Sequence, residues 1–384
     1  MSRFAGKRVL LLDQGMLKDR HGKPIHGIEL FRVRLIRQLL ELGVDVTVGL
    51  ESSWRAVMER EFPEDGARPE CVYGPGWLKG TPLNGLWAAW AAKRRAKKRW
   101  GGSSRYDAVV FGNVRRGLLP AMKTALRGGL AERALVFAHR PPTERVGRAV
   151  ARMGAPVLAV SEHVAGPYRE AGVERVGVYY GLANVGEFFP ASDDDRAAND
   201  DGVTRFCLVA KLPHVIKGED RAVAAFEKLP ESVRSKAELH LASWISEAPY
   251  TQRGVVCHPW MTTAEVAALL RRMDVMLCLS STETFSQAIV QGMLTELPVV
   301  ATPLPVYTEK LDPAEGGAGG VICETDEEIA EAMLRLAEDG ELRRRMGRAG
   351  RAVAMEKYVW DSERFLGEYV FGEETERRRD GETA

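Results

Sequence analysis

Residues 274–309 constrain the fold more than any other part of the chain. An apolar run at 275–279 leads into a polar corner at 280–286, and a helix-like stretch follows to residue 294. A second apolar run, 297–301, leads into another polar corner. This order of strand, loop, helix, strand and loop predicts a βαβ unit. The polar residues then follow the carboxyl ends of two parallel strands, the edge where open α/β sheets bind ligands.

Two polar side chains bracket the first corner, and the backbone between them suits an anion. Glu283 and Gln291 lie on either side of the start of the expected helix. One of them can hold the hydroxyls of a sugar and the other those of a ribose. Residues 286–291 open the helix, so free N–H groups and the positive end of the helix dipole face the corner. Such a helix start favours a diphosphate.

These residues resemble the C-terminal half of the retaining glycosyltransferases of the GT-B fold, in particular the large family 4, or group 1. That family carries the pattern S-x-x-E-x-F-G-x-x-x-x-E-A-M-x-x-G-x-P-V-V-A. The chain matches the pattern at Ser280, Glu283, Phe285, Met293, Pro298, Val299, Val300 and Ala301. It departs where Ser286 replaces a Gly, Gln291 replaces the second Glu, Gly292 replaces an Ala and Glu296 replaces a Gly.

The composition describes a globular protein with room for two domains. The chain has 384 residues, of which 45% are hydrophobic and 28% charged. A net charge of +1 gives no overall attraction to nucleic acid or to anionic membranes, and no specific nucleic-acid partner is expected. Five cysteines lie mostly in apolar runs, which suits buried thiols in a reducing cytoplasm. We expect a cytoplasmic protein without a signal peptide, because the N-terminus leads directly into a strand.

Strands and helices alternate along both halves of the chain, which predicts an α/β protein with two doubly wound parallel sheets. Strands are expected at 8–12, 44–50, 108–111, 134–138, 156–160, 205–210, 238–242, 254–257, 275–279, 298–301 and 320–322. The acidic stretch 191–203 between the halves is interpreted as a linker, and its Asp193 and Asp195 as solvated residues rather than metal ligands.

The resemblance implies the GT-B arrangement, in which two Rossmann-like domains face each other across a cleft. The first domain, at 1–185, would hold the acceptor side, and a C-terminal helix at about 360–380 would complete it. The second domain, at 186–358, would bind the nucleotide-sugar donor.

Two lysines are candidates for stabilising a leaving diphosphate. Lys211 follows the strand expected at 205–210, and Lys217 with Gly218 precedes a helix expected at 220–229. Two cations at a strand end and a helix start can neutralise phosphate without a metal ion. In the resembling family this pair reads Gly-Arg and Lys-Gly, so Lys211 keeps the charge but loses the fork of a guanidinium. The alternative is that both lysines are simply solvated.

The corner itself supplies the expected donor contacts. Glu283 would accept hydrogen bonds from the donor sugar; the alternative is a loop or helix-capping carboxylate. Thr284, Phe285 and Ser286 would present backbone N–H groups to the sugar or phosphate, with Phe285 alternatively a core residue. Gln291 would bind the ribose through its amide, which accepts weaker hydrogen bonds than the family's carboxylate.

Three further candidates follow from position. His139 ends the strand 134–138, where the family carries a His near the donor sugar; a structural His is the alternative. His258 follows the strand 254–257 and could wall the nucleobase, and Cys257 beside it has no partner at metal spacing. Gly27 would let the first loop approach the phosphates, or it is an ordinary turn glycine.

Residues 87–100 contain the strongest local concentration of positive charge. Trp87 and Trp90 precede a basic run from Lys93 to Arg99, and Trp100 follows it. On a helix these cations would point in all directions around the axis. The positive charge is therefore concentrated at one end of the helix rather than on one face. The pattern is compatible with a solvated helix end, with a peripheral contact at the inner face of an anionic membrane, or with an acidic acceptor.

The resemblance as a whole implies a retaining, metal-independent glycosyltransferase. It would move a hexose-type sugar from a UDP- or GDP-linked donor to a hydroxyl of a glycan, a lipid-linked molecule or a small molecule. The catalytic residues would be Lys211, Lys217, Glu283 and His139. The alternative is a non-catalytic GT-B module that binds a nucleotide sugar or a partner protein, which Gln291 and Ser286 favour. A sugar epimerase of the same fold fits less well, because this corner is not its signature.

Overall fold

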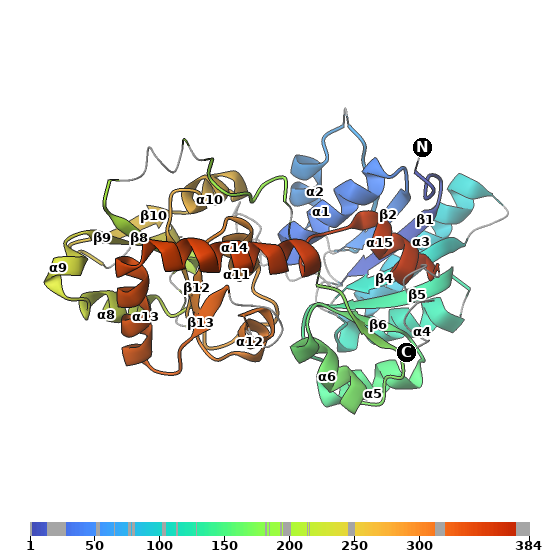
Figure 1. The fold of residues 1–384 in the computed structure, drawn as a ribbon. Coiled ribbons are helices and arrows are strands. Elements are labelled where there is room, and N and C mark those ends of the chain that lie inside the picture. The colour runs from blue at the N-terminus through green and yellow to red at the C-terminus, as the bar shows by residue number, and fades with distance from the viewer. Residues whose placement is uncertain are drawn as a thin grey trace, which may run out of the picture. The chain divides into compact units, whose positions relative to one another are not determined.

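The chain forms two compact units, shown in Figure 1. The computed structural model describes residues 2–13, 28–50, 54–64, 66–75, 78, 81–101, 105–112, 114–127, 129–180, 183, 185–192, 194, 201–212, 214, 216–244, 250–311 and 319–373. The N-terminal unit comprises residues 1–179 and 361–384, and the C-terminal unit comprises residues 180–360. None of the helices in these ranges is long and apolar enough to cross a membrane.

The N-terminal unit is built on a seven-stranded parallel sheet in the order β3-β2-β1-β4-β5-β6-β7. Its strands are β1 (Arg8–Asp13), β2 (Asp45–Leu50), β3 (Glu70–Tyr73), β4 (Tyr106–Gly112), β5 (Ala131–Ala138), β6 (Val157–Ala159) and β7 (Val176–Val178). Its helices are α1 (Ile28–Glu41), α2 (Arg55–Glu61), α3 (Pro82–Trp100), α4 (Leu119–Arg127), α5 (Glu144–Arg152) and α6 (Glu162–Glu170). Sequence reasoning missed β3 and β7, the two edge strands of this sheet, because their mostly half-buried residues form no long apolar run.

The end of the chain returns to the N-terminal unit. It contains α15 (Ser362–Arg364) and a π-helix (Phe365–Phe371). The ring of Phe365 lies 5.3 Å from that of Phe137 on β5. Phe371 stacks on Phe4 at 5.6 Å. These aromatic contacts bury the terminal segment against the first sheet.

The C-terminal unit has a six-stranded parallel sheet in the order β10-β9-β8-β11-β12-β13. Its strands are β8 (Thr204–Leu212), β9 (Ala237–Trp244), β10 (Val255–Pro259), β11 (Val275–Cys278), β12 (Val299–Ala301) and β13 (Gly320–Ile322). Its helices are α8 (Glu219–Glu227), α9 (Glu231–Arg234), α10 (Thr263–Leu270), α11 (Gln287–Leu294), α12 (Pro305–Leu311), α13 (Asp326–Glu338) and α14 (Gly340–Lys357). The predicted α/β class with two doubly wound parallel sheets is confirmed.

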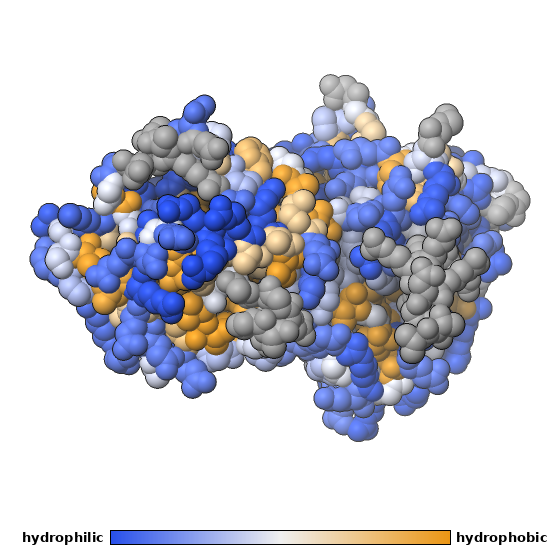
Figure 2. All heavy atoms as spheres, in the orientation of Figure 1, coloured by the Kyte–Doolittle hydropathy of each residue, from blue (hydrophilic) through white to orange (hydrophobic). Residues whose placement is uncertain are grey.

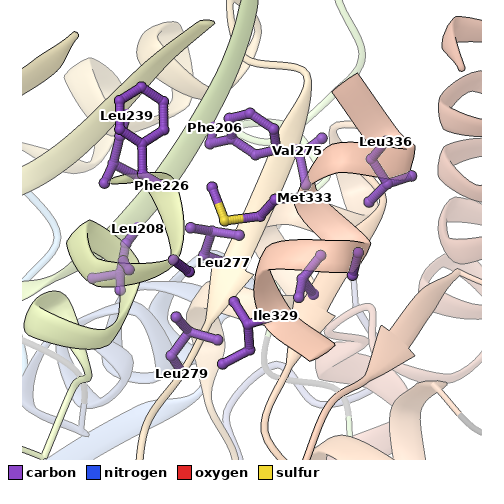
Figure 3. Packing of buried hydrophobic residues seen from close by; sticks show 14 of the residues in the cluster. Phe206, Leu208, Phe226, Leu239, Val275, Leu277, Leu279, Ile329, Met333 and Leu336 are labelled. Carbon is purple, nitrogen blue, oxygen red and sulfur yellow. The ribbon is translucent and has the colours of Figure 1, made fainter. Parts of the chain in front are cut away.

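One face of the second sheet packs against α8 and α13, as Figure 3 shows. Alternate residues of β8 and β11 point into this core, among them Phe206, Leu208, Val275 and Leu277. Their period of two is what a strand buried between helices requires. The core therefore fixes β8 and β11 side by side and places their carboxyl ends at one edge.

The other face of the sheet meets α11, and a glycine makes this contact close. A Cβ on Gly292 would lie 3.0 Å from Cγ of Met276 on β11. The bulky Met276 side chain thus explains why Gly292 stands where the family pattern has Ala. At the surface of the C-terminal unit, α14 exposes Arg344, Arg345 and Arg348. Figure 2 shows strongly hydrophilic residues over this helix.

Candidate active site

Three loops meet at the carboxyl edge of the second sheet. The sheet order turns back between β8 and β11, because β9 and β10 lie on one side of β8 while β12 and β13 lie beyond β11. Ser281 N–H donates to the Ile216 carbonyl at 2.9 Å, and the Thr302 hydroxyl donates to the Ser280 carbonyl at 2.7 Å. We call residues 211, 212, 214, 216–218, 280–286 and 302 the corner. It lies at the topological switch point where doubly wound sheets bind ligands.

Lys217 and Glu283, two predicted catalytic residues, are in direct contact at the corner. Lys217 Nζ lies 2.5 Å from Glu283 Oε1. The Ser280 hydroxyl donates to the same carboxylate oxygen at 3.3 Å. The side chains of Lys217 and Glu283 are 23% and 17% exposed, so a ligand can reach both. The fold thus places a cation and a carboxylate from two distant loops within reach of one ligand.

Gly218 makes this juxtaposition possible. It precedes α8 with φ 78°, a conformation that only glycine adopts without strain. A Cβ at this position would lie 2.4 Å from the Leu279 carbonyl oxygen. The backbone before α8 therefore lies directly against the end of β11, which brings Lys217 to Glu283.

Lys211 lies within β8 rather than after it. The register of β8 against β9 shifts between Val209 and Leu212, so the strand continues past its expected end through an irregular stretch. The Lys211 side chain is exposed, and among the described residues it forms no hydrogen bond or ion pair. It is therefore available to bind an anion at this edge.

The backbone conformation of Ser286 explains what the family's glycine does. Ser286 precedes α11 with φ 60° and ψ 92°, and its side chain does not cap the helix. Glu296, the second replacement of a family glycine, has φ 62°. Within the described ranges these are the only residues other than glycine with positive φ. At both positions the chain thus keeps the positive φ of the family's glycine, and a non-glycine residue is strained in that conformation.

Removing this strain should stabilise the protein. We expect Ser286→Gly and Glu296→Gly each to raise the free energy of unfolding by about 0.5–1 kcal/mol, because a side chain at positive φ costs about 1–2 kcal/mol. Urea unfolding measures the effect. Ser235→Gly is the matched control, since Ser235 has φ −64° and its replacement should destabilise. Destabilisation by all three variants would show that positive φ carries no strain here.

Three other predicted donor contacts lie around the start of α11. Phe285 is buried, at 4% exposure, while Thr284 is half-buried. Gln291 lies in the second turn of α11, half-buried, and its backbone carbonyl accepts from Thr295. Its side chain forms no hydrogen bond with the described part of the chain. The amide is thus open to a ligand.

His139 lies in the N-terminal unit, and Gly27 is outside the described residues. The His139 ring packs 4.7 Å from Phe137 and 5.1 Å from Phe31. Burial, with the nearby charges of Arg32 and Arg140, lowers its pKa to about 3. The imidazole is therefore neutral at neutral pH and cannot serve as an electrostatic cation. Its role near a donor sugar stays a prediction.

His258 lies in β10 and is paired with a residue that sequence reasoning missed. His240 Nδ1 lies 2.9 Å from His258 Nε2, and His240 Nε2 lies 3.1 Å from Glu238 Oε2. Burial lowers the pKa of both histidines. The Glu238–His240–His258 chain fixes the orientation of the His258 ring. The available signal was a polar His240 between Leu239 and Leu241, which places it on the opposite face of the strand from these two core residues.

A buried lysine, Lys310, was also missed. It lies on α12 beneath the corner, and its Nζ is 4.3 Å from the centroid of the Phe285 ring. The sequence did contain a signal for the burial of Lys310. Its helix neighbours Val306, Tyr307 and Leu311 are buried, and Lys310, four positions after Val306, lies on the same helix face.

Comparisons with known proteins agree with this geometry. Residues 192–353 match the family model for glycosyl transferases group 1. The structure of HepE from Anabaena in complex with UDP and glucose is similar, with 17% identity, a TM-score of 0.66, and coverage of 92% of this chain and 96% of that one. Sucrose-phosphate synthase from Thermosynechococcus elongatus has 16% identity and a TM-score of 0.67 over 92% and 95% of the two chains.

The lipopolysaccharide glycosyltransferase WaaG shares 14% identity and a TM-score of 0.61, over 95% of this chain and all of that one. No curated protein sequence matches the chain. At such low identities the solved structures establish the GT-B fold, and the family match covers most of the C-terminal unit. The predicted family resemblance, GT-B fold and glycosyltransferase class are thereby confirmed: the chain is a GT-B-fold glycosyltransferase that matches the glycosyl transferases group 1 family over residues 192–353.

Proposed function

We propose that this protein transfers a hexose from a nucleotide-diphosphate sugar to an acceptor hydroxyl, with retention of anomeric configuration and without a metal ion. The observation that carries the proposal is the contact between Lys217 and Glu283 at the switch point of the C-terminal sheet. A carboxylate suits sugar hydroxyls and an ammonium suits phosphate. The two halves of a nucleotide sugar therefore have matching partners at one place. Retention is proposed from the family resemblance.

In the proposed mechanism the ion pair opens when the donor binds. Lys217 turns from Glu283 to the diphosphate, and Lys211 adds a second cation from β8. The N–H groups at the start of α11 bind the remaining phosphate oxygens. As the bond to the anomeric carbon breaks, negative charge grows on the diphosphate, and these groups stabilise it. Glu283, freed from Lys217, accepts hydrogen bonds from the sugar.

The remaining predicted contacts complete the proposed donor site. His258 would flank the nucleobase, while the expected roles of Gly27 and His139, which belong to the N-terminal unit, stay predictions from the family resemblance. Solved complexes of Anabaena HepE contain UDP and UDP-glucose, which supports a UDP-linked donor over a GDP-linked one. A calorimetric panel of UDP- and GDP-linked sugars in excess chelator tests the donor site. Binding of a UDP-sugar is expected, whereas binding that only manganese or magnesium restores would contradict the metal-independent site.

Gln291 gives a separate test of ribose recognition. If its amide binds the ribose, Gln291→Glu should bind UDP at least as tightly, because a charged acceptor strengthens each hydroxyl bond. Gln291→Ala should weaken binding by about 1–2 kcal/mol, the scale of lost hydrogen bonds at a partly buried site. Titration calorimetry with UDP measures both. Unchanged affinity in both variants would remove Gln291 from the site.

The second candidate, a non-catalytic module that binds a nucleotide sugar, is favoured by the replacement of the family's second carboxylate by Gln291. Such a module would bind the donor without turnover. Release of UDP from a bound UDP-sugar separates the two candidates, since only an enzyme releases it.

We also propose a peripheral contact of α3 with an anionic membrane. Trp90 is 53% exposed and Leu83 is 56% exposed, while Trp87 is half-buried. The basic residues in the range 93–99 are exposed, and the Arg94 guanidinium lies 4.8 Å from the Trp90 ring centroid. Exposed Trp and Leu beside clustered cations suit the interface of an anionic bilayer.

Vesicle flotation tests this contact. The double variant Trp90→Ser and Lys97→Glu should lose binding to vesicles that contain phosphatidylserine. Arg344→Glu on α14, which changes the net charge by the same amount, is the control and should keep binding. Equal binding by both variants, or no binding by the unmodified protein, would contradict the contact.

A further inference from the structure

Lys310 is a buried cation beneath the corner. It is 1% exposed, and its Nζ donates to the Val306 carbonyl at 3.1 Å. The ammonium lies 4.3 Å from the ring centroid of Phe285 and 5.2 Å from that of Tyr358. Within the described ranges Lys310 forms no ion pair. Two aromatic faces and one carbonyl therefore take the place of water around this charge.

The charged and titratable groups around Lys310 come from several elements. Glu309 precedes it on α12, Cys278 ends β11 and Glu283 belongs to the corner, and all three favour the protonated amine. Burial outweighs them and lowers the pKa of Lys310 to about 8. Tyr358, at the end of α14, faces it through its ring. The amine thus changes charge near physiological pH while lying within electrostatic range of Glu283.

A lysine is a costly choice for this position. Its helix neighbours Val306, Tyr307 and Leu311 are buried, so an apolar residue would complete the same face. Replacing a buried charge by an apolar residue of similar volume is often neutral or stabilising. The fold therefore does not need this charge, whereas an anionic ligand above Phe285 would benefit from it.

We propose that Lys310 is a positioning residue for the nucleotide-sugar donor, whose protonated amine holds Phe285 in place and adds fixed positive charge beneath the diphosphate site. This inference rests on the proposed donor site at the corner. Donor affinity then depends on the protonation of Lys310. Bound diphosphate favours the charged amine, so affinity is full below pH 8 and falls as pH rises through that value, by at most tenfold per pH unit.

The test compares Lys310→Met with the unmodified protein, using UDP as the probe. The variant should melt at the same or a higher temperature, yet bind UDP about tenfold more weakly at pH 7.5, the size of one lost charge contact. Between pH 7.5 and 9.5 its affinity should change less than that of the unmodified protein. Titration of UDP itself affects both proteins equally. Lys228→Met, on the exposed end of α8, is the control and should bind normally.

Unchanged UDP affinity and an unchanged pH profile in Lys310→Met would overturn the inference. If that variant fails to fold, the inference is tested on the unmodified protein instead. UDP binding is then measured by calorimetry at pH 8.5 in two buffers that differ in ionisation enthalpy. Proton uptake on UDP binding supports Lys310, and zero uptake overturns it. UDP binding that Lys217→Ala weakens but Lys310→Met does not would refute this inference alone. Absence of any nucleotide binding would refute the proposed function as well.

Discussion

Replacing Lys217 by Ala is expected to reduce kcat/KM about 100-fold or more, the usual loss when a group that stabilises developing charge is removed. UDP affinity should also fall, because the ammonium contacts phosphate in the bound state. Folding should be retained, since the side chain is 23% exposed and its ion pair with Glu283 lies at the surface of the site. Lys211→Ala should likewise lose most activity, whereas Lys211→Arg should keep it, because the family's own residue is Arg.

Steady-state kinetics, UDP calorimetry and thermal unfolding measure these effects together. Lys228→Ala is the matched control. Lys228 follows the last residue of α8, the helix that Lys217 precedes, and its side chain is 45% exposed and pairs with Glu327. It should change none of the three quantities. Near-normal turnover in both Lys211→Ala and Lys217→Ala would show that the corner is not where the diphosphate leaves.

Glu283→Gln should strongly reduce turnover but leave nucleotide binding intact. The carboxylate is assigned to the sugar, so its loss should lower kcat/KM about 100-fold, because charge-assisted hydrogen bonds to the reacting sugar weaken. UDP lacks the sugar, so its affinity should stay the same or increase. An increase is expected because Lys217 no longer needs to leave Glu283 before it contacts phosphate.

Lys217→Ala and Glu283→Gln should affect UDP affinity differently, so comparing the two variants tests the separate roles of the two residues. Lys217→Ala should weaken UDP binding, and Glu283→Gln should not, although the two side chains touch in the unbound protein. Ser280→Ala is a milder control, since it removes only a 3.3 Å hydrogen bond to the same carboxylate. Equal losses of UDP affinity in the Lys217 and Glu283 variants would mean that their contact is only structural.

The corner could be predicted because its signals are local. Residues 280–301 carry strand, loop and helix patterns in one contiguous stretch. The order of these patterns along the chain therefore indicates which residues lie at the carboxyl edge of the sheet. The direct contact between Lys217 and Glu283 was not predicted; it arises because β8 and β11 are neighbouring parallel strands. The two missed strands, β3 and β7, gave no such signal because they are the edge strands of the first sheet and their residues are mostly half-buried.

Side-chain partners across the sheet could not be predicted in the same way. His240 meets His258 only because β9 and β10 pair in a particular register. Lys310 shares a helix face with buried residues, but its ring partners Phe285 and Tyr358 could not be predicted because they lie far from it in the sequence. Likewise, Ser286 and Glu296 could be recognised as departures from a pattern, but only their φ values show what the replaced glycines supply.

The most direct test of the proposed activity is UDP release from UDP-linked sugars in excess chelator, by the unmodified protein and by Glu283→Gln. We expect the unmodified protein to release UDP from at least one UDP-sugar. Glu283→Gln should release almost none, although it should still bind UDP as tightly. Equal release by both proteins, or a complete requirement for added metal, would contradict the assignment of Glu283 and the two lysines as the catalytic centre.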